Sequence, residues 1–199
     1  MKMKLLKTSL FIWAVITVLC GVIYPFFITS LSGLVFPDQS QGSLFENEKG
    51  IAGSTLIGQT FTRPEYFHGR LSATDPANNG SGSGASNLGP TNADFIKQVN
   101  ARVAGVRKLE KLAADAKVPA DMVTSSASGL DPHISVESAM LQARRVAGER
   151  GMKISDVEKL ITQNTEQAFL YFWGSKRVNV LKLNMALDHN GSNRHGPNY

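Results

Sequence analysis

The chain has 199 residues, a length that fits one domain with an appendage. Its formal net charge of +5 does not indicate a nucleic-acid partner, because three of the 21 Lys and Arg residues precede a long apolar segment, leaving 18 basic residues against 16 acidic ones. The single cysteine, Cys20, lies inside that segment, which excludes a disulfide or a thiolate metal site from the rest of the chain.

Residues 8–36 carry no charged side chain, whereas a helix needs only about 20 apolar residues to cross a membrane. We therefore expect a transmembrane helix over about residues 9–30. A cleaved signal peptide would have an apolar core of about 7–15 residues and a small-residue cleavage site, and neither fits. Lipoprotein processing at Cys20 is disfavoured because Leu19 is bulky. The side chains expected to anchor this helix are Phe11, Trp13, Pro25 and Phe26.

Positive charge is unequal on the two sides of this helix. Lys2, Lys4 and Lys7 precede it, and Lys49 is the basic residue near its other end. Because basic flanks stay in the cytoplasm, we expect residues 1–7 to be cytoplasmic and the main domain to face outward. Pro25 predicts a kink, which is either harmless or filled by neighbouring membrane helices.

The next part of the chain mixes turn-rich and periodic segments. We interpret residues 37–53 as a neck and "STLIGQTF", residues 54–61, as a half-buried strand. Residues 78–90 are rich in Gly and Ser and predict a loop. Thr91, with Asp94 three residues on, predicts a helix N-terminus. The buried face of that helix is expected to consist of Phe95, Ile96, Val99, Val103, Val106 and Leu109.

The last third of the chain predicts two helices and a strand. One helix runs from Val136 to Arg150 and ends at Gly151. The next begins at Ser155, where Ser155 and Glu158 form a capping box. "RVNVLKLNMAL", residues 177–187, is predicted as a strand, and residues 189–199 as a disordered tail. The fold class is thus a mixed α/β (α+β) extracytoplasmic domain, residues 54–188, on one N-terminal transmembrane helix.

Few chemical sites are indicated. The glycine-rich loop lacks the lysine and the GxxxxGK[ST] spacing of a phosphate-binding loop, so we expect a structural or docking loop. The four histidines are isolated or lie in the tail, which does not predict a metal site. Arg144, Arg145 and Arg150 are interpreted as a solvated helix face rather than an anion site.

The segment "SGLDPHIS", residues 128–135, contains the residue types of a hydrolase triad. Ser128, Asp131 and His133 are so close in sequence, around a proline, that their convergence is difficult. A structural interpretation explains the segment with fewer assumptions than a catalytic one. Gly129 supplies an unusual backbone angle, Asp131 closes a turn, and Ser135 caps the following helix. We therefore predict a turn and no catalytic residues.

Six segments, in order, resemble the C subunit of the potassium-transporting P-type ATPase, the Kdp system. They are "GSTLIGQTF" (53–61), "YFHGRLSA" (66–73), "SGSGASNLGPTN" (81–92), "SGLDPHIS" (128–135), "QARRVAGERG" (142–151) and "VNVLKLNMALD" (178–188). One departure is Leu71, where the family usually has proline. The candidate structural or docking residues in these segments are Gln59, Arg70, Asn87, Ser128, Asp131, His133, Gln142, Arg145, Asn179 and Asn184.

The resemblance implies a non-catalytic subunit of a potassium import pump in the bacterial inner membrane. Its implied partners are a P-type ATP-hydrolysing subunit, a channel-like potassium-binding subunit and a small membrane subunit. The implied roles are complex assembly and catalytic chaperoning, in which the subunit raises the ATP affinity of the hydrolysing subunit. An outward-facing domain cannot touch cytoplasmic ATP, so no cofactor is assigned, and ATP is expected only at the interface with the hydrolysing subunit.

Two other classes of function stay open at this point. One is an anchored extracytoplasmic hydrolase that uses Ser128, Asp131 and His133. The other is a free-standing binding domain without membrane partners. The hydrolase predicts that Ser128→Ala abolishes function and leaves assembly intact, and the binding domain predicts a monomer in detergent.

Overall fold

The computed structural model of the chain describes residues 2–47, 50–170 and 173–191. They form two compact units, residues 1–52 and 53–199. The first unit begins with one long helix built from α1 (Lys2–Val18), the π-helical turn η1 (Leu19–Ile23) and α2 (Tyr24–Val35). The segment interpreted as a neck contains the short helix α3 (Pro37–Ser40) and the strand β1 (Leu44–Asn47), which pairs with β2 (Gly50–Ser54).

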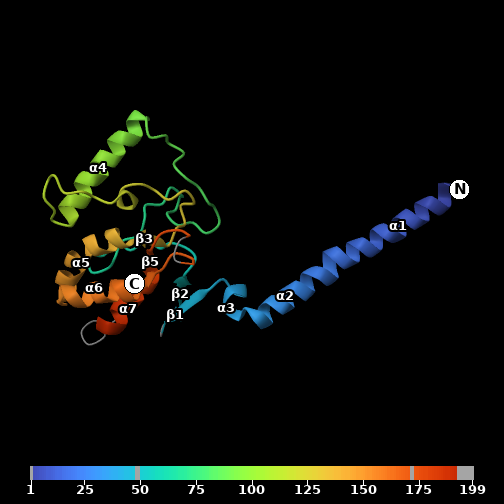
Figure 1. Cartoon of the computed structure of the whole chain (residues 1–199). Coiled ribbons are helices and arrows are strands. Elements are labelled where there is room, and N and C mark those ends of the chain that lie inside the picture. Colours follow the sequence, from blue (N-terminus) through green and yellow to red (C-terminus); the bar gives the residue numbers. More distant parts are fainter. Residues whose placement is uncertain (1, 48–49, 171–172, 192–199) are drawn as a thin grey trace. The chain divides into compact units, whose positions relative to one another are not determined.

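The long helix is apolar and has the length of a membrane span. Met3–Val35 contains 33 residues, and none of its most apolar window is buried. At about 1.5 Å per residue, it rises about 50 Å, more than the hydrocarbon thickness of about 30 Å. The predicted kink at Pro25 takes the form of the π turn, because the Tyr24 N–H donates to the Leu19 carbonyl and the helix continues. Figure 1 shows this helix running on without a break.

The second unit is a mixed α/β domain, as the sequence predicts. Its sheet has the order β3–β5–β4, with β3 (His133–Ser135) and β4 (Thr165–Glu166) both antiparallel to β5 (Arg177–Asn179). Figure 1 shows α5 (Val136–Arg150), α6 (Ile154–Gln163) and α7 (Val180–Gly191) beside the strands. The core holds Phe67, Ile134, Ala139, Ala143, Val146, Ala147, Val157, Ile161, Val178, Val180, Leu183 and Leu187.

α5 matches its prediction. The Ser135 hydroxyl accepts a hydrogen bond from the Ser138 N–H, and Gly151 ends the helix with a left-handed φ of 62°. That φ favours glycine because a side chain there clashes with the backbone. The next helix differs by one residue, since α6 begins at Ile154 after Lys153. The predicted capping box at Ser155 is therefore wrong, because Ser155 already lies in the first turn.

One predicted strand is only partly right and another is wrong: of residues 177–187, Arg177–Asn179 form β5 as predicted. Residues 180–187 are helical, and the buried positions Val180, Leu183, Asn184 and Leu187 recur at three and four residues, as one helix face requires. Residues 55–61 form turns instead of a strand. Their backbone does not pair with a neighbouring strand; instead, the Gly58 N–H donates to the carbonyl of the distant residue Leu130 at 2.8 Å. The predicted tail also begins too early, because α7 extends to Gly191; residues 192–199 lie outside the described part.

The helix α4 (Ala93–Leu109) differs from its prediction at both its cap and its face. Asn92, not Thr91, is the N-cap, and its side chain accepts from the Phe95 N–H. The predicted apolar face is only partly buried: Ile96 is 46% and Leu109 is 43% exposed, whereas its other four residues are half-buried. Figure 1 shows α4 apart from α5, α6 and α7. Helical spacing therefore predicted the helix correctly, but two residues of the predicted face lie outside its covered part.

The η2 turn (Ala120–Met122) places Asp121 against the start of α5. The Asp121 carboxylate accepts from the Ser135 N–H at 2.7 Å and from the Ser138 hydroxyl at 2.6 Å. The N-terminus of α5 thus has a negative charge beside it, which suits the positive end of the helix dipole.

Candidate functional site

The segment "SGLDPHIS" is a turn that leads into β3 and α5. The Ser128 hydroxyl accepts from the Leu130 N–H, and the Asp131 carboxylate accepts from the His133 N–H at 3.0 Å. Gly129 has a φ of 70°, in the left-handed region. Ser135 then caps α5. The side chains of Ser128, Asp131 and Ser135 thus each accept a local backbone hydrogen bond.

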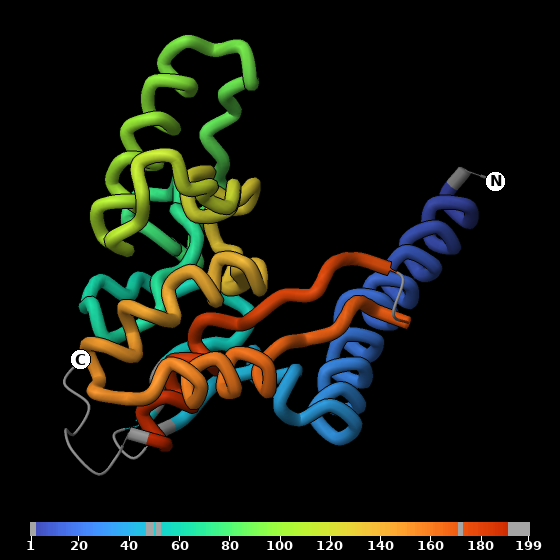
Figure 2. Tube along the Cα trace, turned by 60° about the vertical axis from the view of Figure 1, so that its left-hand side comes forward, coloured from blue at the N-terminus to red at the C-terminus, as the bar shows by residue number. Residues whose placement is uncertain are grey.

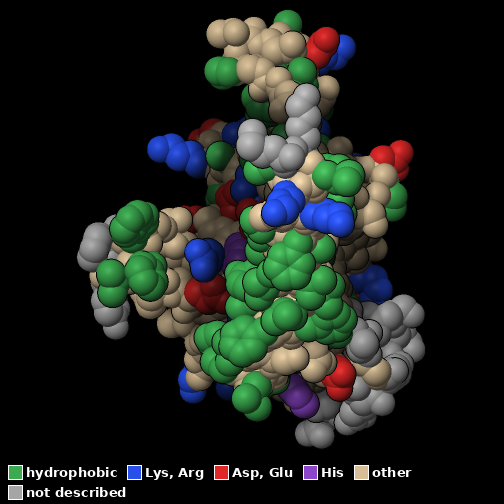
Figure 3. Space-filling model, turned by 90° about the vertical axis from the view of Figure 1, so that its right-hand side faces the viewer, with side chains coloured by type: hydrophobic (Ala, Val, Ile, Leu, Met, Phe, Trp, Pro, Cys, Tyr) green, Lys and Arg blue, Asp and Glu red, His purple; other side chains and the backbone are tan. Residues whose placement is uncertain are grey.

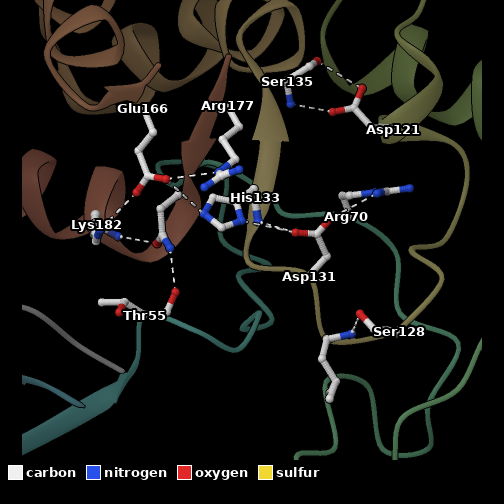
Figure 4. A network of polar contacts seen from close by, with 12 residues as sticks. Thr55, Arg70, Asp121, Ser128, Asp131, His133, Ser135, Glu166, Arg177 and Lys182 are labelled. Atoms are coloured by element: carbon white, nitrogen blue, oxygen red, sulfur yellow. Dashed lines mark hydrogen bonds and ion pairs between the residues drawn. The ribbon is translucent and has the colours of Figure 1, made fainter. Parts of the chain in front are cut away.

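A charged network surrounds this turn (Figure 4). The Arg70 guanidinium lies 3.0 Å from the Asp131 carboxylate. The His133 ring stands between two acids, with Nδ1 3.4 Å from Asp131 and Nε2 3.5 Å from Glu166. The Glu166 carboxylate also contacts Arg177 and Lys182, each at 3.1 Å. The network therefore joins four parts of the domain: Arg70, the turn of residues 128–135 (the signature turn), the β4–β5 hairpin and α7.

These contacts set the ionisation of the two acids. Burial alone raises the pKa of Asp131, but hydrogen bonds from His133 and Arg70 outweigh it and lower that pKa to about 2. Burial likewise opposes the charge on Glu166, and Lys182, Arg177 and His133 outweigh it, so its pKa is lowered. Both acids are therefore charged at neutral pH, as an ionic brace requires.

Acid should weaken this brace. The pKa of Asp131 is about 2 in the folded chain against an ordinary value of 3.8, so its stabilisation is full above about pH 4 and is lost as pH falls through about 2. We expect this to remove about 2 kcal/mol of unfolding free energy. Unfolding followed by circular dichroism across this range should show a smaller pH dependence for Asp131→Asn. The exposed acid of α6 provides the control Asp156→Asn, and equal curves for the two variants would contradict the assignment.

The triad geometry is not formed. Both ring nitrogens of His133 face carboxylates, and the Ser128 hydroxyl is engaged with the Leu130 N–H. Figure 4 shows Ser128 on the far side of Asp131 from His133. A serine nucleophile needs a histidine nitrogen free to accept its proton. The arrangement therefore supports a structural turn.

Ser128→Ala should consequently have a small effect. It removes one partly buried hydrogen bond, so we expect a loss of about 1 kcal/mol or less in unfolding free energy. Transport and complex recovery, measured together in cells that depend on the variant, should both be retained. Loss of transport with normal recovery of the complex would revive the hydrolase hypothesis.

Gly129 holds the turn against the glycine-rich loop. A Cβ added at this residue would lie 2.7 Å from both the Gly84 carbonyl oxygen and the Thr74 Cγ2. The Gly84 N–H donates to the Ser128 carbonyl at 2.9 Å, and the Ser81 and Gly82 N–H groups bond to Asn79. These three amides are engaged within the chain, so the loop is packed rather than presented to a phosphate.

Gly129→Ala should therefore destabilise the domain. The left-handed φ and the contact with Gly84 together predict a loss of about 2–3 kcal/mol. Gly105→Ala is the matched control, because Gly105 lies on α4 with nothing within 4 Å of an added Cβ. That variant should gain about 0.5–1 kcal/mol. Thermal unfolding of both variants checks the pair, and similar shifts for the two would contradict the packing argument.

A second group of motif residues clamps an extended segment. The Gln142 amide bonds to both the N–H and the carbonyl of His68, at 2.8 and 3.1 Å. The Asn184 amide does the same for Phe67, at 2.9 and 3.0 Å. Asn179 donates to the Thr55 carbonyl at 2.7 Å. Three side-chain amides thus replace the strand partner that these backbone groups lack.

Arg145 and Arg150 do not form a solvated face. The Arg145 side chain is 6% exposed and pairs with Glu110, whose side chain is 1% exposed, at 3.0 Å. Arg150 pairs with Asp188 at 2.8 Å and lies over the Tyr66 ring. Only Arg144 of the three is exposed. The earlier interpretation is wrong because both buried arginines point toward residues 64–66, which helical periodicity alone does not reveal.

Burial affects two further ionisable groups beside Arg145. It raises the pKa of Glu110, although the Arg145 charge and hydrogen bond oppose the change. It lowers the pKa of His68, and the positive charge of Arg145 adds to that effect. Glu110 escaped the sequence analysis, and His68 was considered only as an isolated histidine. The one signal for Glu110 was its place directly after a helix, among basic residues.

The remaining motif candidates are spread out. Gln59 lies against Gly53, where an added Cβ would sit 1.5 Å from the Gln59 amide nitrogen. Asn87 is exposed, with a φ of 53°, and it does not belong to the charged network. Glu166, Arg177 and Lys182 belong to the network but were not predicted, because their sequence separation from His133 hides the contact.

The cavities at these residues are small or open. One, between Arg70, Asp131 and Val180, holds about 10 Å³, about the room that a single water needs. The buried Arg70 Nε faces no protein partner, and a water there would satisfy it. The other is an open groove of about 530 Å³ beside Asp121, Ser135 and Glu137. Within the described ranges, no three metal-binding side chains gather.

The sequence of the chain is similar to known proteins along most of its length. The sequence model of a family described as "KdpC: K+-transporting ATPase, c chain" matches residues 6–189. The chain belongs to this family. The potassium-transporting ATPase KdpC subunit of Janthinobacterium sp. (strain Marseille) is 48% identical over 92% of this chain and 96% of its own length. That of Geobacter sulfurreducens is 46% identical over 94% of this chain and 98% of its own length.

A third relative is the KdpC subunit of Beijerinckia indica subsp. indica, 50% identical over 86% of this chain and 87% of its own length. The chain is therefore an accessory subunit of a potassium-transporting ATPase and not its ATP-hydrolysing enzyme. The family match includes the apolar helix, and this combination supports a membrane anchor in a membrane pump. The motif residues that carried the resemblance serve chiefly as internal braces of the domain.

Proposed function

We propose that the chain assembles and stabilises a high-affinity, ATP-driven potassium import pump. The observation that carries this proposal is the family match over residues 6–189, which spans both the anchor and the braced domain. The partners are the P-type ATP-hydrolysing subunit, the channel-like potassium-binding subunit and the small membrane subunit. A domain held by ionic and amide braces suits a rigid docking role, because binding then orders few side chains.

The proposed location is the inner membrane of a bacterial cell. Residues 1–7 lie in the cytoplasm and the domain lies outside, because Lys2, Lys4 and Lys7 flank the amino end of the helix. None of the most apolar part of the helix is buried in the isolated chain. It packs beside the channel-like subunit, and the domain lies over the external ion entrance.

The second part of the proposal concerns ATP. The subunit acts as a catalytic chaperone that raises the ATP affinity of the hydrolysing subunit. With the domain outside the cell, the effect reaches the nucleotide through membrane-helix contacts. ATP contact is confined to the interface with the hydrolysing subunit. The sequence of this chain has no GxxxxGK[ST] motif that would supply a separate nucleotide site.

Co-purification tests the assembly role. The C-terminus is tagged, source cells are grown under potassium starvation, and the membranes are solubilised gently. Mass spectrometry should find a P-type ATPase chain and a channel-like chain in amounts comparable to the tagged chain. Recovery of the tagged chain alone, in a detergent that preserves other complexes, would overturn the proposal.

Steady-state kinetics tests the nucleotide role separately. The potassium-stimulated ATPase activity is measured for the complex and for the complex depleted of this chain. We expect a higher KM for ATP after depletion, restored on adding the chain back. An unchanged KM with intact assembly would remove the chaperone role and leave the assembly role standing.

A further inference from the structure

The hairpin that connects β4 and β5 projects from the domain. Its base is paired in register, Thr165 with Val178 and Glu166 with Arg177. Farther out, Phe169 and Trp173 pair again, and each donates its N–H to the carbonyl of the other, at 3.0 and 2.9 Å. Figure 2 shows the two arms side by side, extending away from α5 and α6 of the same domain.

The outer end of this hairpin is apolar and uncovered. Phe169 and Trp173 are each 71% exposed, and Leu170 is 60% exposed. Because Phe169 and Trp173 are directly opposite each other in the ladder, their side chains lie on the same face. Figure 3 shows hydrophobic side chains on this projection. In the described part of the domain, no other Phe, Tyr or Trp is among the exposed large hydrophobic residues.

The backbone of the hairpin has two positive φ angles, at Leu170 and Gly174. Leu170 has a left-handed φ of 52°, which is uncommon for a residue with a branched side chain. The returning arm has one extra residue between the two paired regions, and Gly174, with a φ of 97°, accommodates it. Strained conformations of this kind concentrate at functional positions.

Basic side chains lie just behind the apolar end. Arg177 and Lys182 are 54% and 45% exposed at their side chains, and Lys176 is also exposed. The acid among them, Glu166, is occupied by Arg177 and Lys182. The projection therefore presents aromatic rings at its tip and net positive charge at its base.

We propose that this tip, Phe169, Leu170 and Trp173, binds the lipid surface of the membrane that the chain's own helix crosses. Aromatic side chains favour the level of the lipid headgroups, and basic residues behind them favour anionic lipids. Residues 37–53 tether the domain to the helix, and their fully extended length of about 60 Å is an upper limit because α3 and β1 lie within them. The membrane is thus always within reach, so the contact gains from a high effective concentration.

This contact does not depend on which pump subunits the chain joins. It rests on the anchor and on the exposed apolar tip. A groove on a partner protein is the competing occupant, and the experiment distinguishes the two.

Trp173 provides a direct probe, because the chain has only one other tryptophan, Trp13. The full chain with Trp13→Phe is reconstituted, without partners, in bilayers that contain phosphatidylglycerol. We expect the Trp173 emission to be shifted to the blue relative to that of a tryptophan exposed to water. Acrylamide should no longer quench this emission, and lipids brominated near the headgroup should quench it. A matched control places the tryptophan elsewhere on the domain, with Trp13→Phe, Trp173→Phe and Ile154→Trp together, and it should stay accessible to acrylamide.

A second variant tests the tip itself. Phe169→Ser with Leu170→Ser, in the Trp13→Phe chain, should lose the lipid quenching while circular dichroism confirms the fold. The proposal is overturned if Trp173 is quenched by acrylamide in bilayers as strongly as the control tryptophan. It is equally overturned if protection appears only after the other pump subunits are added and without quenching by brominated lipid, which would identify a protein groove as the occupant.

Discussion

Replacing Arg145 with alanine should lower the free energy of unfolding of the domain by about 3–5 kcal/mol. The change leaves the Glu110 carboxylate buried without its positive partner, although its side chain is only 1% exposed. It also removes the donors to the carbonyls of Pro64 and Tyr66. Domains of this size are stable by only about 5–15 kcal/mol, so much of the folded population should be lost.

Chemical denaturation followed by circular dichroism measures this effect. Arg144→Ala is the matched control, because Arg144 is the exposed neighbour on the same helix, and it should change stability by about 0.5 kcal/mol or less. Adding Glu110→Gln to Arg145→Ala should recover part of the loss, since it removes the isolated buried charge. If Arg145→Ala and Arg144→Ala were equally stable, the buried ion pair would have no structural role.

Replacing Asn184 with alanine should cost about 3–4 kcal/mol of unfolding free energy. The Asn184 side chain is fully buried, and its amide satisfies both the N–H and the carbonyl of Phe67. Phe67 is itself fully buried, so neither backbone group can turn to water for a substitute partner. The variant also leaves a cavity in the core.

Asn190→Ala is the control for this experiment. Asn190 lies on the same helix and is exposed, and its amide bonds to the Ala186 carbonyl of its own helix. It should change stability by about 0.5 kcal/mol or less. Amide hydrogen exchange at Phe67 provides a local measurement, and it should accelerate in Asn184→Ala and not in Asn190→Ala. Unchanged exchange at Phe67 would contradict the clamp.

Local signals predicted several elements correctly. The uncharged segment before Pro37 predicted the long helix, since helices that span lipid need an uninterrupted apolar surface. Ser135 and Gly151 predicted both ends of α5, because the cap hydrogen bond and the left-handed φ are made within the helix itself. The signature turn was likewise predicted from Gly129, Asp131 and Ser135.

The errors occurred where a distant segment determines the local structure. Residues 55–61 have strand-like composition, but Gly58 bonds to Leu130 instead of to a neighbouring strand. Residues 180–187 contain β-branched and apolar residues at spacings that suit either structure, and packing of Leu183 and Leu187 into the core selects the helix. α4 formed as predicted but lacks the neighbour that would bury Ile96.

The candidate site residues also divide into features that the sequence predicted and features that depend on distant segments. Sequence resemblance identified Gln142, Arg145, Asn179 and Asn184, but not their task, which is to satisfy backbone groups of segments far away in the chain. Glu110 and Glu166 were missed for the converse reason, since their partners Arg145 and His133 are brought to them only by folding.

Composition, residue order and contacts within a few residues were enough to predict the long apolar helix, the mixed α/β class, the family and both ends of α5. Only the folded structure shows that α7 is a helix, that polar motif residues such as Gln142 and Asn184 brace the core, and that Phe169 and Trp173 are exposed. Burial and long-range hydrogen bonding set those outcomes, and neither is a property of a local stretch of chain.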